Sequence, residues 1–118
     1  MDKRAKLLKL LTIELEDLVE DVEQLLSAHE KRLASGEITN YVYQENAAVL
    51  KNEISCINEF MKEIPGFDLS RVADEMELAE WIKETFQQVQ EEHCFSHAAE
   101  AIFMRKLGKA LGYVHGTF

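Results

Sequence analysis

The side chains best suited to chemistry gather in the short stretch 93–97 and just beyond it. His93 and His97 are four residues apart, so on one helix they would share a face, and Glu100 follows three residues later. Imidazole and carboxylate groups in that arrangement can bind zinc or iron. The competing interpretation is a polar turn between two helices. The sequence favours that turn, because no second set of ligands with a matching spacing follows.

No other chemical signature accompanies this cluster. The sequence has no glycine-rich phosphate loop and no serine or cysteine nucleophile motif. Its two cysteines are too few for a disulfide framework. We therefore predict no cofactor and favour a non-enzymatic protein. The alternative is a metal-binding helical bundle protein or enzyme that uses His93, His97 and Glu100.

Length and charge narrow the class of protein. The 118 residues suit a single domain, 1–118, and the net charge of −9 opposes binding to a nucleic acid backbone. No apolar stretch is long enough to cross a membrane, and Glu14 and Glu16 end the first apolar run too early for a signal peptide. We expect no nucleic acid partner, no membrane association and a cytoplasmic location.

A helical hairpin is the element most strongly indicated. Two apolar stripes with alternating gaps of three and four, the heptad pattern of a coiled coil, run along the first two predicted helices. When they are paired in reverse order, every pair is equidistant from Gly36 along the chain, and the pair nearest the turn is a polar layer that fixes the register. The pairs are Leu8 with Ile64, Leu11 with Met61, Leu15 with Ile57, Leu18 with Ile54, Val22 with Leu50, Leu25 with Ala47, and His29 with Tyr43.

Capping and breaking residues set the bounds of this hairpin. Asp2 can cap a first helix that runs to about residue 33, and Gly36 suits the left-handed position after it. Thr39 or Asn40 can cap a second helix, which continues to about residue 63 before Pro65 stops it. The hairpin therefore spans about 2–64.

Two shorter helices are predicted to complete an all-α, up-down four-helix bundle. Asp68 or Ser70 can cap the third, and the fourth runs from about residue 96 to 113, followed by a loose tail from His115. If the stretch 93–97 does not turn, the third and fourth helices fuse into one. Their apolar stripes are Val72, Ala79, Ile82, Phe86 and Val89, then Ala99, Phe103, Leu107, Ala110 and Leu111.

Both hairpin helices carry a second apolar line beside the seam, which is more apolar surface than a bare hairpin buries. We expect the two shorter helices to leave part of these lines uncovered. We therefore predict an interaction protein, such as an adaptor, regulator or chaperone, that binds a partner helix or a second copy of itself. The predicted contact residues are Val19, Leu26 and Leu33 on the first helix, Val42 and Val49 on the second, and Trp81 on the third.

Overall fold

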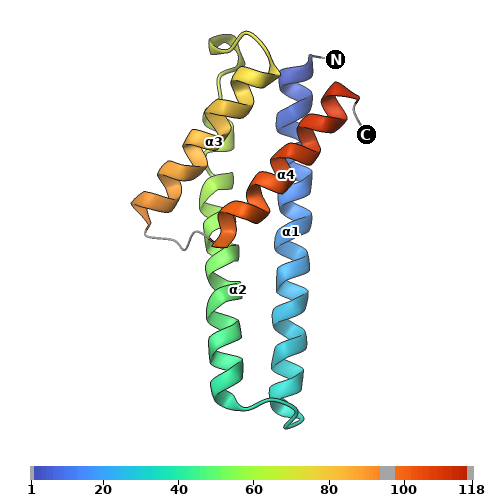
Figure 1. The fold of residues 1–118 in the computed structure, drawn as a ribbon, viewed down its shortest axis with the longest axis vertical. Helices are drawn as coiled ribbons and strands as arrows, with labels where there is room; N and C mark the ends of the chain where they lie inside the picture. The colour runs from blue at the N-terminus through green and yellow to red at the C-terminus, as the bar shows by residue number, and fades with distance from the viewer. Residues whose placement is uncertain (1, 94–97, 117–118) are drawn as a thin grey trace.

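The computed structural model describes residues 2–93 and 98–116, and within them every element of regular secondary structure is a helix, as predicted. Figure 1 shows α1 and α2 as two long helices side by side, with α3 and α4 lying over the half of this pair that is far from the turn. The elements are α1 (Lys3–Ala34), α2 (Asn40–Met61), the 3-10 turns η1 (Ile64–Gly66) and η2 (Leu69–Arg71), α3 (Glu75–Glu92) and α4 (Ala98–His115).

Local capping explains where the first two helices begin and end. The Asp2 carboxylate accepts a hydrogen bond from the backbone N–H of Arg4, and the Thr39 hydroxyl accepts one from the N–H of Val42. Gly36 follows α1 with φ of 79°, a left-handed conformation that favours glycine. Only the short segment 35–39 therefore connects α1 to α2. Because the connection is short, the two helices pack against each other.

The seam between α1 and α2 is buried through the middle of the pair. Leu15 and Ile57 are almost fully buried, and so are Val22 and Leu50 two layers further toward the turn. Leu18 and Ile54 line the same small pocket, which makes them neighbours as predicted. These residues are buried as a seam requires, and Leu18 and Ile54 are the pair that the pocket brings together.

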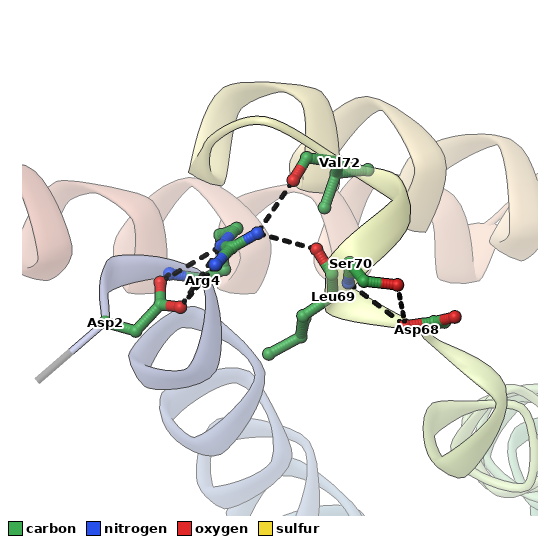
Figure 2. A network of polar contacts seen from close by, with 6 residues as sticks. All are labelled: Asp2, Arg4, Asp68, Leu69, Ser70 and Val72. Atoms are coloured by element: carbon green, nitrogen blue, oxygen red, sulfur yellow. Dashed lines mark hydrogen bonds and ion pairs between the residues drawn. The ribbon is translucent and has the colours of Figure 1, made fainter.

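The segment between α2 and α3 is held against the start of α1 by one arginine. Figure 2 shows the Arg4 guanidinium between Asp2 and this segment. Its Nη1 donates to the backbone carbonyl of Leu69 at 2.7 Å and to that of Val72 at 2.8 Å, while its Nη2 pairs with the Asp2 carboxylate at 2.7 Å. Charged donors make strong bonds to carbonyls, so this contact fixes the approach to α3.

The predicted start of the third helix was wrong. Asp68 caps only η2, and Val72 lies in extended backbone after that turn and not on the helix. The true N-cap is Asp74, whose carboxylate accepts from the N–H of Glu77, while Glu77 reaches back to the N–H of Ala73 at 2.6 Å. This reciprocal arrangement resembles a capping box, and its Asp-x-x-Glu pattern was present in the sequence.

Aromatic residues from three helices form the centre of the core. Phe60 of α2, Phe86 of α3 and Phe103 of α4 have no exposed surface. Phe86 and Phe103 stack at 3.9 Å between ring centroids, and Phe60 packs edge-on against Phe103 at 4.8 Å. These contacts join α3 and α4 to the face of the hairpin that carries Phe60.

Charged contacts hold α4 on α1. The Glu14 carboxylate lies 3.4 Å from Nζ of Lys106 and 3.2 Å from Nζ of Lys109. Burial by itself would raise the pKa of Glu14, but the hydrogen bonds from the two lysines outweigh it and the pKa is lowered. Residue 115 is not part of a loose tail, since His115 ends α4 and its Nδ1 lies 3.5 Å from Glu75 of α3.

The helix contacts are compatible with a bundle. Residues 94–97, which would join α3 to α4, lie outside the described residues, so the up-down order stays a prediction. Within the described part of the chain, no helix has the length and apolar character needed to cross a membrane.

Candidate protein-interaction surface

Two columns of largely apolar side chains run along the hairpin on the side where α4 packs. On α1, Leu18 lines a pocket together with Ile102 of α4. On α2, Cys56 and Phe60 are fully buried, and Phe60 contacts Phe103 of α4. Residues seven apart share a helix face, so these contacts identify the column that each helix turns toward α4.

Both columns lose their cover toward the turn. On α1 the exposed fraction rises from 0% at Leu11 to 49% at Leu25. On α2 it rises from 0% at Cys56 to 53% at Val49, and Val42 is 38% exposed. Figure 1 shows the reason, because α3 and α4 do not reach the half of the hairpin next to the turn. An apolar face therefore continues beyond the helices that cover it.

We name this uncovered surface the lower apolar face and define it by Leu25, Val42 and Val49. Val42 and Val49 are seven residues apart, which places them on one side of α2, and the half-buried Asn46 lies between them as the one polar member of that column. Leu25 follows Leu18 by two helical turns on the same side of α1. Clustered exposed apolar side chains of this kind are typical of interaction sites.

The residues predicted to contact a partner fall into three groups. Val42 and Val49 belong to the lower apolar face. Leu26 and Leu33 are half-buried and lie on the adjoining column of α1, next to the seam. Val19 and Trp81 already pack against the core of the same chain.

Trp81 has neighbours within the chain. Its ring packs edge-on against Phe67 at 4.8 Å between centroids, and the Arg71 guanidinium lies 5.3 Å above it. These contacts fix the end of the segment that leads into α3. Trp81 therefore belongs to the core near the start of α3 and is not part of the lower apolar face.

Leu25 is the member of the face that the sequence analysis placed elsewhere. We expected it in the seam opposite Ala47, yet it is half exposed while Ala47 is buried. A straight α-helix has 3.6 residues per turn, so a stripe with a strict period of 3.5 drifts around the helix. Over the length of α1 that drift carries Leu25 out of the seam.

The rim of the lower apolar face is acidic. Asp17 and Asp21 are exposed on the α1 flank, and Glu45 is exposed on the α2 flank. Basic side chains stand at both ends of the α1 flank. Near the turn Arg32 lies 3.9 Å from Glu37, and at the upper end Arg105, Lys106 and Lys109 of α4 line a pocket with Leu18. Between these ends the apolar centre is flanked by negative charge, from Asp21 on α1 and Glu45 on α2.

Glu53 lies at the upper end of this face, one turn beyond Val49. It lines the pocket formed with Leu18, Ile54 and Ile102, where the cover of α4 begins. Burial raises its pKa. Within residues 2–93 and 98–116 its carboxylate has no hydrogen bond or ion pair, which distinguishes it from Glu14.

The predicted metal ligands do not form a site within the described part of the chain. His93 is the C-cap of α3, and its Nε2 lies 3.7 Å from Glu59. Glu100 of α4 accepts a hydrogen bond from Gln87 at 3.2 Å, and His97 lies outside the described residues. Among the residues placed by the structure, no three His, Cys, Asp or Glu side chains gather closely enough to hold a metal ion.

The lower apolar face is thus the surface with the most distinctive combination of shape and charge. It lies on two helices of the hairpin whose seam is packed independently of it. Its role has to be argued from this geometry, because compared with known proteins the chain matches no protein-family model, no curated protein and no solved structure.

Proposed function

We propose that this protein is a non-enzymatic helical interaction protein that binds an amphipathic helix of another protein on its lower apolar face. One observation carries the proposal: the columns of α1 and α2 lose their cover at the same level, where Leu25 and Val49 become half exposed. A partner helix laid along them would bury both columns, as helix-in-groove recognition does. About 12 partner residues, roughly 18 Å of helix, would span the face.

The charge of the rim favours a foreign partner over a second copy. Two copies of this face packed together would bring Asp17, Asp21 and Glu45 of one copy near the same residues of the other. Like charges across an interface oppose association. A partner from another protein carries no such constraint.

We further propose that the four helices form an up-down bundle, and that the protein is cytoplasmic, with reduced thiols and no nucleic acid partner. The alternative function, a metal protein that uses His93, His97 and Glu100, also stays a prediction. It is tested separately by metal analysis.

The experiment compares three forms of the chain in pull-downs from native cytoplasm: wild type, Val49→Asp and Ile13→Asp. Ile13 is a matched control because it is 45% exposed and lies two residues from both Leu11 and Leu15, on the opposite side of α1. A partner bound through the lower apolar face is retained by wild type and Ile13→Asp and lost from Val49→Asp. The interaction is then measured again with the purified partner.

Mass measurement in solution decides between the two kinds of occupant. We expect a monomeric wild-type chain. A dimer that Leu25→Asp converts to a monomer would assign the face to a second copy. Retention of the same partner by wild type and Val49→Asp would show that the face has no part in binding.

A further inference from the structure

Glu53 has an environment that a carboxylate seldom keeps without a counter-charge. It is partly buried, and Leu18, Ile54, Ala99 and Ile102 surround the same pocket. An ionised group among apolar side chains loses hydration, and here no described residue replaces that hydration with a hydrogen bond or an ion pair. The free protein therefore carries the free-energy cost of this lost hydration.

Other acidic side chains near helix contacts are paired within the chain. Glu14 has Lys106 and Lys109, and Glu59 has Lys62 at 2.8 Å. Glu53 differs from them by lying where the cover of α4 ends and the lower apolar face begins. A ligand that lies along that face would therefore contact the Glu53 carboxylate at its upper end.

We propose that Glu53 is the charge anchor that selects a basic amphipathic helix, by pairing with a Lys or Arg of the partner at the upper end of the lower apolar face. This inference rests on the proposed function and specifies the chemistry of the partner. The partial desolvation of Glu53 is already present in the free protein, so pairing restores a favourable interaction with little further loss of hydration. In such surroundings the effective dielectric constant is low and the ion pair is strengthened.

The same reasoning describes the partner sequence. Apolar residues at positions i, i+3 or i+4, and i+7 would cover Leu25 and Val49. Because Glu53 follows Val49 by one turn, the basic residue would stand three or four positions from the last apolar one. Further Lys or Arg residues on the partner flanks would face Asp21 and Glu45, whereas Asp17 already lies close enough to Lys109 of α4 to interact with its charge.

The test uses three synthetic amphipathic peptides of about 16 residues with the same apolar stripe. Their flanks carry Lys and Arg, Gln, or Glu. Binding to the full chain is measured by fluorescence anisotropy at low and high salt. The proteins are wild type, Glu53→Gln, Val49→Asp and, as a matched control, Glu16→Gln, which changes an exposed carboxylate of α1 on another face.

We expect wild type to bind the basic peptide at least about tenfold more tightly than the acidic one at low salt. Glu53→Gln should weaken the basic peptide by about fivefold to tenfold and leave the Gln peptide unchanged. Glu16→Gln should have an effect of less than about twofold, since an exposed charge is screened. Val49→Asp should weaken all three peptides.

Two failures are distinguishable. If Glu53→Gln affects the basic peptide no more than Glu16→Gln does, while Val49→Asp still abolishes binding, Glu53 is not the anchor and the proposed function stands. If no peptide binds, or Val49→Asp leaves binding intact, the proposed function fails and the anchor with it. Circular dichroism spectra of each variant establish that it is folded.

Discussion

The same substitution made at three levels of one helix face should have three different costs. Leu11, Leu18 and Leu25 are separated by seven residues each, and we consider Leu→Ala at each position. Leu11 is fully buried, Leu18 is half-buried beside Ile102, and Leu25 is 49% exposed. The chemistry removed is identical, so only the cover provided by α3 and α4 differs.

The expected free energies of unfolding follow from that burial. Leu→Ala in a packed core costs about 2–5 kcal/mol, because a cavity adds to the lost transfer energy, and Leu11 should fall in this range. Full burial of a leucine side chain is worth about 1.5–3 kcal/mol, so half of it at Leu25 gives about 1 kcal/mol and no cavity. Leu18 should fall between them.

Urea denaturation followed by circular dichroism at 222 nm measures these differences in the free energy of unfolding, and thermal denaturation measures the matching shifts in Tm. For a chain of this size, 1 kcal/mol corresponds to roughly 3–6 °C in Tm, so Leu11→Ala should lower the Tm by about 6–30 °C and Leu25→Ala by no more than about 6 °C. An unchanged slope with urea concentration would show that all three variants unfold from a similar structure.

Equal costs at Leu11 and Leu25 would refute the reasoning. Such a result would mean that Leu25 is covered in the free protein, by a second copy or by a different arrangement of α3 and α4. The dependence of the Tm on protein concentration would identify the second copy, since dimerisation makes the Tm rise with concentration.

Four further predictions concern single groups. Glu53→Gln should stabilise the free protein at pH 7 by up to about 1 kcal/mol, because the raised pKa of Glu53 means that the fold disfavours its ionised form. Urea titrations should show that this gain disappears below about pH 4.5, where the carboxyl group is protonated in both the folded and the unfolded protein. Glu14→Gln should destabilise the protein at pH 7, by less than about 1 kcal/mol, because the lowered pKa of Glu14 gives stability above about pH 4.5. That stability is lost as the pH falls through the pKa of Glu14 in the folded state, so the acid unfolding curves of wild type and Glu14→Gln should converge. His29→Leu should raise the Tm, because Nδ1 of His29 is buried with no hydrogen-bond partner among the described residues; a lower Tm would show that the imidazole stabilises the turn. Protein purified without a histidine tag should contain no stoichiometric zinc, iron or manganese, and a bound metal that is lost in His93→Ala would establish the alternative function.

Periodicity and caps predicted much of this fold. The helical class, the caps at Asp2 and Thr39, and the neighbouring Leu18 and Ile54 follow from local signals that tertiary structure did not override. The start of α3 did not follow, because three acidic or hydroxyl side chains compete as caps within seven residues. Asp68 was taken by a 3-10 turn, and only the reciprocal bond with Glu77 distinguishes Asp74.

The surface was harder to predict than the fold. The position of Val42 and Val49 beside the seam predicted that their side chains would be exposed. Trp81 could not be assigned between partner and core without knowing where Phe67 lies. Leu25 was misplaced because a drift of about 10° per turn accumulates along a long helix. Glu53 carried no sequence signal, since its isolation depends on which side chains α4 brings to it.

The charged contact between α1 and α4 has a consequence for how the chain folds during synthesis. Glu14 and its lysine partners are separated by 92 and 95 residues, whereas the seam of the hairpin joins residues on either side of one turn. The seam can therefore close once α2 has been made, and the 54 or so residues through the end of α4 take about 3–11 s to follow at usual rates of synthesis. During that interval Phe60 would face water, because α3 and α4 supply its aromatic contacts. A ribosome that stalls after α2 would therefore release a hairpin with one apolar face uncovered along its whole length, which would be prone to aggregation.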